Sequence, residues 1–177
     1  MSSNHLLEKN IFTTLCFSLI NENKWDTLLE FFALKIIDIN IKDHSGRNSL
    51  FWAIQKNQID VIKKLVSLNI NTNEVSPNLS AINYAVHQDN VKAIRCLKNC
   101  GINVNEIDDI NSTALIYAII CNKSNCINYL LNNGANIYHE DFLGNSAFSL
   151  AQDLKLVNLV KMLKEFDKKS TKKLNIK

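Results

Sequence analysis

The chain has 177 residues, 46% apolar and 21% charged, which excludes a disordered or membrane-spanning chain and suffices for one buried core. Four glycines and one proline are too few for an all-β fold or a glycine-rich nucleotide-binding fold. The formal net charge is +3, but five of the 20 basic residues lie in the last ten positions, which leaves 15 basic and 17 acidic side chains in residues 1–167. We therefore expect no nucleic-acid partner, because such a protein carries a basic face on its folded part.

The first predicted elements are two helices within residues 4–40. The second of them runs from Trp25 to Leu34 and places large apolar side chains on one face. This segment lacks the motif that recurs in the rest of the chain. We interpret it as a divergent repeat that shields one end of a stacked core.

A short pattern then occurs four times: a small polar residue, a small residue, a large apolar residue, two variable positions and an alanine. The four copies begin at Asn48, Ser80, Thr113 and Ser146 and end at Ala53, Ala85, Ala118 and Ala151. Their large apolar residues are separated by 32, 33 and 33 positions, which indicates a repeat architecture. The first residues are good N-caps and predict helix starts, and the alanines predict close approach between neighbouring helix pairs.

A second helix follows each copy of the pattern. Apolar residues recur at helical spacing within 59–66, 91–97, 126–131 and 156–163. Gly101 and Gly134 come directly after two of these helices, and Asn69 holds the equivalent position after another. Such positions favour a left-handed backbone that ends a helix.

Three segments resemble the ankyrin repeat family: Asp43-His44-Ser45-Gly46, Asp141-Phe142-Leu143-Gly144 and Asn132-Asn133-Gly134-Ala135-Asn136. The resemblance covers roughly residues 5–167. None of the four copies keeps the family's proline and histidine. The turn after Asn73 has lost one residue together with its Asp and Gly and carries Pro77. We therefore expect that turn to be shortened or bent.

The resemblance implies an all-α ankyrin-repeat solenoid of about five stacked helix pairs, with short hairpins at the turn tips. We place a single domain at 1–167. Its parts are an N-terminal capping repeat at 4–40, full repeats at 41–73, 74–106 and 107–139, and a C-terminal capping repeat at 140–167. Residues 168–177 are expected to be a basic, flexible tail.

No catalytic site, metal or cofactor is expected. The four histidines lie tens of residues apart, and no nucleophile or phosphate-binding motif is present. The five cysteines suggest reduced thiols and a cytoplasmic, reducing compartment. We interpret most of them as core residues; zinc binding and redox sensing stay open as alternatives. The residues concerned are Cys96, Cys100, Cys121 and Cys126.

The resemblance also implies a module that binds a protein partner through its concave groove and turn tips, as a monomer before binding and without membrane insertion. The predicted contact residues vary between repeats: Arg47, Lys56, His87, Gln88, Asp109, Ile110, Ser112, Phe142 and Leu143. Apolar residues clustered on turn tips mark an interaction site. The alternative is that Phe142 and Leu143 fold inward over the last helix pair. Trp52, Tyr84 and Tyr117 share one repeat position and either pack between helices or stack a ligand.

Small ankyrin-repeat proteins of this composition are similar to those that intracellular bacteria and some viruses direct at host proteins. The first partner hypothesis is therefore a host protein, with delivery of the chain into the host cell. The second is an enzyme complex of the producing cell, in which the chain is a regulatory or accessory subunit. A metal- or redox-responsive role of the cysteines is a third.

Overall fold

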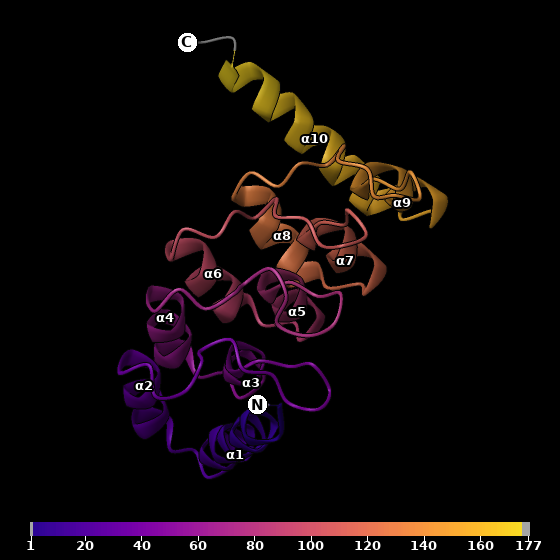
Figure 1. Cartoon of the computed structure of the whole chain (residues 1–177). Helices are drawn as coiled ribbons and strands as arrows, with labels where there is room; N and C mark the ends of the chain where they lie inside the picture. The colour runs from indigo at the N-terminus through magenta and orange to yellow at the C-terminus, as the bar shows by residue number, and fades with distance from the viewer. Residues whose placement is uncertain (1, 175–177) are drawn as a thin grey trace.

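The computed structural model describes residues 2–174 and the side chains of residues 10–168. Within these limits the chain forms ten helices and no strand (Figure 1). The helices are α1 Ser2–Asn21, α2 Trp25–Ala33, α3 Ser49–Gln55, α4 Ile59–Ser67, α5 Ala81–His87, α6 Val91–Asn99, α7 Ala114–Ile120, α8 Ser124–Asn132, α9 Ala147–Asp153 and α10 Val157–Leu174. Isolated β-bridges join Ser76 to Leu79, Ile107 to Thr113 and Glu140 to Ser146.

The helices stack as five consecutive pairs in two layers. The odd-numbered helices α1 to α9 form one layer, and α2, α4, α6 and α8 lie beside them in the other (Figure 1). Each of the helices α1 to α9 packs on its own pair partner and on the neighbouring helices of its layer, and α10 packs on α9. The predicted all-α solenoid is confirmed. We call the layer of even-numbered helices, with the start of α10, the outer face.

The predicted helix starts follow from local chemistry. Each of the four predicted capping side chains accepts a hydrogen bond from the backbone N–H three residues later. The pairs are Asn48 with Phe51, Ser80 with Asn83, Thr113 with Ile116 and Ser146 with Ser149. A side-chain oxygen at this position satisfies a donor that has no partner inside the helix.

The predicted close approach between pairs is also observed. The four alanines that end the pattern are fully buried where the inner helices meet: Ala53, Ala85, Ala118 and Ala151. The outer helices contribute large side chains such as Ile62, Ile94 and Leu130, which are fully buried as well. Neighbouring pairs therefore share one continuous core, which is how repeats that cannot fold alone become stable.

Left-handed residues end the helices at regular intervals. Asn69, Gly101 and Gly134 have φ values of 62°, 96° and 87°, as their repeat position predicted. A second series, missed by sequence reasoning, lies in the short loops inside each pair, at Asn23, Asn57, Asp89, Asn122 and Lys155. Asn and Asp tolerate this conformation better than most residues, which explains their prevalence there.

Most of the predicted basic tail is helical, and its flexibility stays a prediction. Helix α10 runs without interruption from Val157 to Leu174, so residues 168–174 are helical. These residues include several lysines and neither glycine nor proline, and lysine is a good helix former. Residues 175–177 of the predicted tail lie outside the described residues. No helix in the described part is both long and apolar enough to traverse a bilayer.

Candidate protein-interaction surface

Four turns of one design connect the repeats. Each is closed by a backbone hydrogen bond from its first to its last residue and has a left-handed fourth residue. They span 43–47, 75–79, 108–112 and 141–145. The expectation of a shortened turn is therefore wrong: the turn at 75–79 is as long as the others, because the missing residue falls between Asn73 and Val75. Asn78 takes the left-handed position there, with φ 60°.

An aspartate begins three of the turns and holds their backbone in place. One oxygen of Asp108 accepts hydrogen bonds from the backbone N–H groups of Ile110 and Ser112, at 3.1 and 2.9 Å. Its other oxygen accepts the Tyr117 hydroxyl at 2.6 Å and the Asn83 amide at 3.2 Å. Asp108 therefore ties its turn to α5 and α7. The 33-residue spacing between Asp108 and Asp141 was a signal for this role, but the sequence analysis names only Asp109 in this turn.

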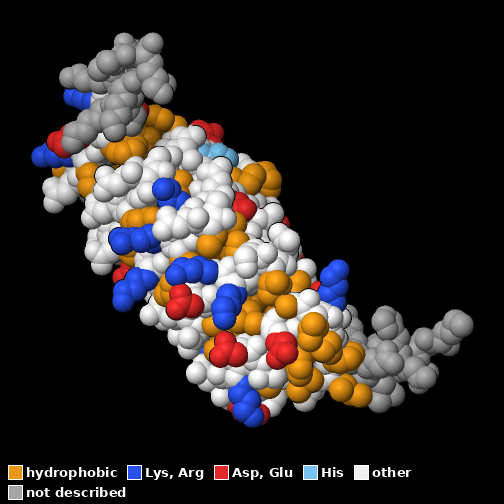
Figure 2. Space-filling view, turned by 90° about the vertical axis from the view of Figure 1, so that its left-hand side faces the viewer, with side chains coloured by type: hydrophobic (Ala, Val, Ile, Leu, Met, Phe, Trp, Pro, Cys, Tyr) orange, Lys and Arg blue, Asp and Glu red, His pale blue; other side chains and the backbone are white. Residues whose placement is uncertain are grey.

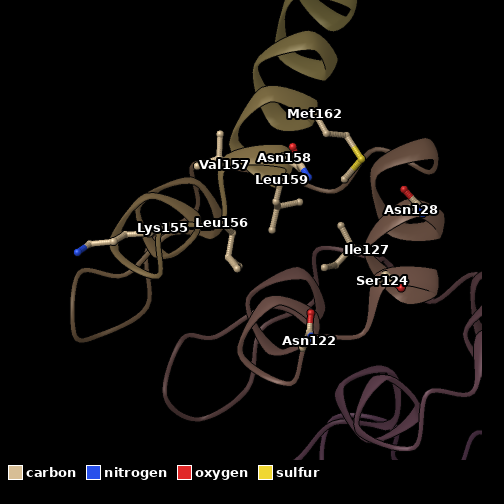
Figure 3. Close-up of a pocket in the computed structure, with 10 residues that line it drawn as sticks. All are labelled: Asn122, Ser124, Ile127, Asn128, Lys155, Leu156, Val157, Asn158, Leu159 and Met162. Carbon is tan, nitrogen blue, oxygen red and sulfur yellow. The ribbon is translucent and has the colours of Figure 1, made fainter.

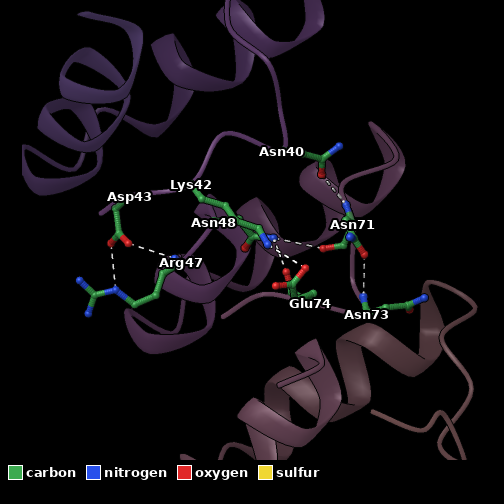
Figure 4. Close-up of polar contacts among 8 residues, drawn as sticks. All are labelled: Asn40, Lys42, Asp43, Arg47, Asn48, Asn71, Asn73 and Glu74. Atoms are coloured by element: carbon green, nitrogen blue, oxygen red, sulfur yellow. Dashed lines mark hydrogen bonds and ion pairs between the residues drawn. The ribbon is translucent and has the colours of Figure 1, made fainter. Parts of the chain in front are cut away.

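In the first turn the second oxygen of the aspartate pairs with arginine. The Arg47 Nε lies 2.9 Å from Asp43 Oδ2 (Figure 4). The Arg47 guanidinium also stacks over the Trp52 ring, 4.5 Å from its centroid. Burial works against ionisation of Asp43, but hydrogen bonds from the Arg47 and Ser45 backbone and the Arg47 guanidinium outweigh it. Together they hold the pKa of the Asp43 carboxyl below its usual value.

Asparagine side chains bridge consecutive repeats at the base of the turns. Asn40 Oδ1 accepts the backbone N–H of Asn71 at 2.8 Å (Figure 4), and Asn105 Oδ1 accepts that of Asn136 at 2.7 Å. Asn73, the equivalent residue at the intervening junction, forms no such bond with a described residue. This is the junction at which the repeat is one residue shorter, so the lost residue removes an inter-repeat bond rather than the turn.

The last two turns are joined directly. The backbone N–H of Phe142 donates to the carbonyl of Ile110 at 3.1 Å, and the Asn111 side chain donates to the carbonyl of Glu140 at 2.7 Å. His139 Nε2 lies 2.9 Å from the Asn111 carbonyl oxygen. These bonds hold the two tips side by side, which is the arrangement that we expected for the apolar turn residues.

The apolar turn residues point into solvent. Ile110, Phe142 and Leu143 are 48%, 75% and 85% exposed, so the alternative that Phe142 and Leu143 fold inward is wrong. We call these three residues the turn-tip patch. Ile107, which sequence reasoning missed, is also exposed at the base of the same pair of turns. Its position directly before the Asp108 turn was the available signal.

The other predicted contact residues lie in different environments. Asp109 is exposed beside the turn-tip patch, whereas Ser112 is buried and does not present its side chain to a partner. Arg47 is half-buried and already contacts Asp43 and Trp52, and its contact with a partner stays a prediction. The remaining three are exposed at the C-terminal ends of α3 and α5: Lys56, His87 and Gln88. That is the end of the inner helices opposite to the turns, so the structure does not unite them with the patch.

The three aromatic residues of one repeat position do not form a ladder. Phe51, not Trp52, stacks on Tyr84, with ring centroids 4.1 Å apart and an interplanar angle of 18°. Tyr84 is buried, and burial raises its pKa to about 12. The Tyr117 hydroxyl is taken by Asp108. Packing, rather than an open stacking platform, accounts for these side chains.

Cys96 and Cys100 lie one turn apart at the C-terminal end of α6 and interact, whereas Cys121 and Cys126 lie at the end of α7 and in α8. Cys126 is fully buried in α8 and its thiol donates to Asp89 Oδ1 at 3.3 Å, while Cys100 and Cys121 follow the ends of α6 and α7. Burial raises the pKa of the Cys96 thiol to about 11. No group of three or more metal-ligating side chains comes together in the described part of the chain. The absence of a metal stays a prediction.

Known proteins share this repeat architecture. Residues 68–141 match the family model of ankyrin repeats (3 copies). The chain is 32% identical over 135 residues to an ankyrin repeat protein of fowlpox virus (strain NVSL), which covers 73% of this chain and 32% of the relative. It is also 32% identical over 99 residues to an ankyrin repeat protein of Acanthamoeba polyphaga mimivirus, covering 55% of this chain and 13% of the relative. The chain thus spans a third or less of the length of these relatives. Its stacked helix pairs, recurring turns and these matches together show that the chain belongs to the ankyrin repeat family.

Proposed function

We propose that the chain is a non-catalytic binding module whose protein partner docks on the turn-tip patch and the adjoining groove. Ankyrin repeats generally mediate protein–protein interaction. The observation that carries the proposal is the exposure of Ile110, Phe142 and Leu143 on two turns that are hydrogen-bonded to each other. Exposing large apolar side chains side by side to water is unfavourable, and a monomeric protein seldom does so unless a partner covers them.

The patch is preorganised for binding. Asp141 Oδ1 accepts the backbone N–H groups of Leu143 and Asn145, each at 2.9 Å, so the tip is held before any partner arrives. A rigid tip loses little conformational entropy on association. Burying one large apolar side chain contributes about 1.5–3 kcal/mol, which makes Phe142 the strongest single anchor of the patch.

The partner class is the finer part of the proposal. Both relatives belong to viruses, which multiply inside host cells, so a host protein in a reducing compartment is the first class to test. A regulatory or accessory role in an enzyme complex of the producing cell is the second class. The five cysteines, all within the described residues, form no disulfide and are compatible with either setting.

A pull-down with matched variants tests the proposal. The immobilised chain is incubated with host lysate and, separately, with lysate of the source organism, and bound proteins are quantified by mass spectrometry. Phe142→Ala with Leu143→Ser is expected to reduce capture of a specific partner at least about tenfold, or about 1.4 kcal/mol. The same change is expected to alter the free energy of unfolding by less than about 1 kcal/mol, since both side chains are exposed.

The control removes a comparable apolar surface at the other end of the stack. Leu34→Ser with Ile36→Ser exchanges two residues that are 63% and 45% exposed and should leave capture unchanged. A partner lost equally with both variants would indicate nonspecific adhesion. A partner retained by the Phe142 and Leu143 variant would dock elsewhere. Loss of several kcal/mol of stability would place these residues in the core.

A further inference from the structure

The outer face carries a stripe of cations on α6. Lys92, Arg95 and Lys98 are spaced three residues apart and are all exposed, while the apolar residues between them face the core. None of the three forms an ion pair with a described residue. Helix α6 itself contains no acidic residue. Figure 2 shows Lys and Arg side chains gathered on this side of the molecule, with fewer acidic side chains among them.

Three acidic groups on the elements around the stripe have partners of their own. On α4, Asp60 pairs with Lys63 at 2.9 Å, and Lys64 lies 3.6 Å from Asp26 of α2. Asp89, in the loop before α6, accepts the neutral thiol of Cys126 and keeps its charge, so it offsets one of the cations. The stripe is therefore a local surplus of positive charge on a body whose residues 1–167 carry more acidic than basic side chains.

The stripe continues without opposing charge onto α8. This helix has no charged residue and exposes amide side chains such as Asn125 and Asn128. The Arg95 guanidinium lies 5.6 Å from the Tyr129 ring centroid, so it spans the gap between α6 and α8. A ligand that follows the stripe thus reaches α8 without meeting a carboxylate of that helix.

An apolar cleft of about 510 Å³ lies beyond α8, where α10 begins. The side chains of Ile127, Leu159 and Met162 converge on it from the two helices (Figure 3). Asn128 and Asn158 stand at its rim, and the single charged residue of the lining is Lys155. The cleft exists because α10 leaves the stack instead of lying along α8 (Figure 1). Its volume falls in the range of ligand-binding clefts.

We propose that the outer face binds an acidic segment of a protein that inserts one large apolar side chain into the α8–α10 cleft and lays carboxylates along Lys92, Arg95 and Lys98. The cleft and the stripe are one to two helix spacings apart, roughly 15 Å, which an extended chain covers in about five residues. A nucleic acid or a lipid surface fits less well, because neither offers a single large apolar side chain to the α8–α10 cleft. This surface is separate from the turn-tip patch.

The test uses a phage library of random twelve-residue peptides, selected on the immobilised full chain and measured as fluorescein-labelled peptides by anisotropy. We expect selected peptides to carry at least three acidic residues on one side of a Phe, Trp, Leu or Met. Their affinity should fall at least tenfold for Lys92→Glu with Arg95→Glu and Lys98→Glu. It should fall similarly for Asn128→Glu with Asn158→Glu, which places two carboxylates at the mouth of the cleft.

Matched controls separate this surface from other effects. Lys24→Glu with Lys35→Glu and Lys168→Glu produces the same change in net charge at exposed positions elsewhere and should alter affinity less than twofold. The Phe142 and Leu143 variant should bind these peptides as the wild type does, whatever happens to its capture of lysate proteins.

Three outcomes would overturn the proposal. The first is that no acidic peptide is selected, and the second is that selected peptides bind the two Glu-substituted variants as well as the wild type. The third is that a twenty-nucleotide oligothymidine or vesicles containing phosphatidylserine bind with equal or higher affinity through the same three cations. In that case the stripe is a general polyanion surface and the cleft plays no part.

Discussion

Replacing Asp108 by alanine should destabilise the middle of the stack far more than the same change at Asp141. Asp108 is 8% exposed and accepts four hydrogen bonds, two from its own turn and two from Tyr117 and Asn83. Asn83 is fully buried and its amide oxygen already has no hydrogen-bond partner, so loss of the carboxylate leaves this side chain without a described partner. Hydrogen bonds to charged groups contribute about 1.5–3 kcal/mol each and are not additive. We expect a loss of about 3–5 kcal/mol.

Asp141 is the matched position. It accepts the equivalent two backbone N–H groups of its turn, but among the described residues its other oxygen contacts only the Asn145 amide, at 3.3 Å. Asp141 is only partly buried, so water can replace the carboxylate, and we expect Asp141→Ala to cost about 1–1.5 kcal/mol.

Urea unfolding followed by circular dichroism at about 222 nm measures both losses. A double-mutant cycle with Tyr117→Phe should give a coupling energy of about 1–2 kcal/mol, because the hydroxyl and the carboxylate lie 2.6 Å apart. Equal costs for Asp108→Ala and Asp141→Ala, or a coupling energy near zero, would refute the assignment of Asp108 as the group that ties turn and helices together.

Three further substitutions test the turns and the core. Gly46→Ala should lower the free energy of unfolding by about 1 kcal/mol more than Gly144→Ala, because the two residues have φ of 76° and 77° but an added Cβ meets Pro77, 2.9 Å away, only at Gly46. Adding Pro77→Ala should remove the difference. Equal melting temperatures of the two alanine variants would contradict the contact. Asp43→Asn should reduce stability most near about pH 7 and progressively less below about pH 4. The folded protein lowers the pKa of this carboxyl, so its ionised form stabilises the fold above the unfolded pKa, and this stabilisation is lost as the pH falls through the folded pKa. A pH-independent difference in melting temperature would refute this prediction. Ala118→Asp should lower the free energy of unfolding by more than about 4 kcal/mol, because this position is fully buried between helices, and Ala118→Ser should lower it much less. An unchanged chemical unfolding transition of the Asp variant would contradict the repeat alignment.

Much of the fold could be predicted because it depends on chemistry that recurs with the repeat. Ser80 and Thr113 cap their helices through a local hydrogen bond, so residue type and position suffice to predict it. Ala118 is small because two helices meet there, and the period carries that information. The left-handed Gly134 follows in the same way. The end of α10 was less predictable, since a lysine-rich segment without glycine or proline suits either a frayed end or a continued helix.

By itself, the sequence determined the repeat, the helix starts and the apolar character of the turn tips. Only the tertiary structure decided that Phe142 points into solvent, that Arg47 is taken by Asp43 and Trp52, and that Ser112 is buried. The α8–α10 cleft is likewise a tertiary feature. The physical reason is that a side chain on a turn is covered or left open by the neighbouring repeat. That depends on how consecutive pairs are placed against each other, whereas the period records only which positions are equivalent.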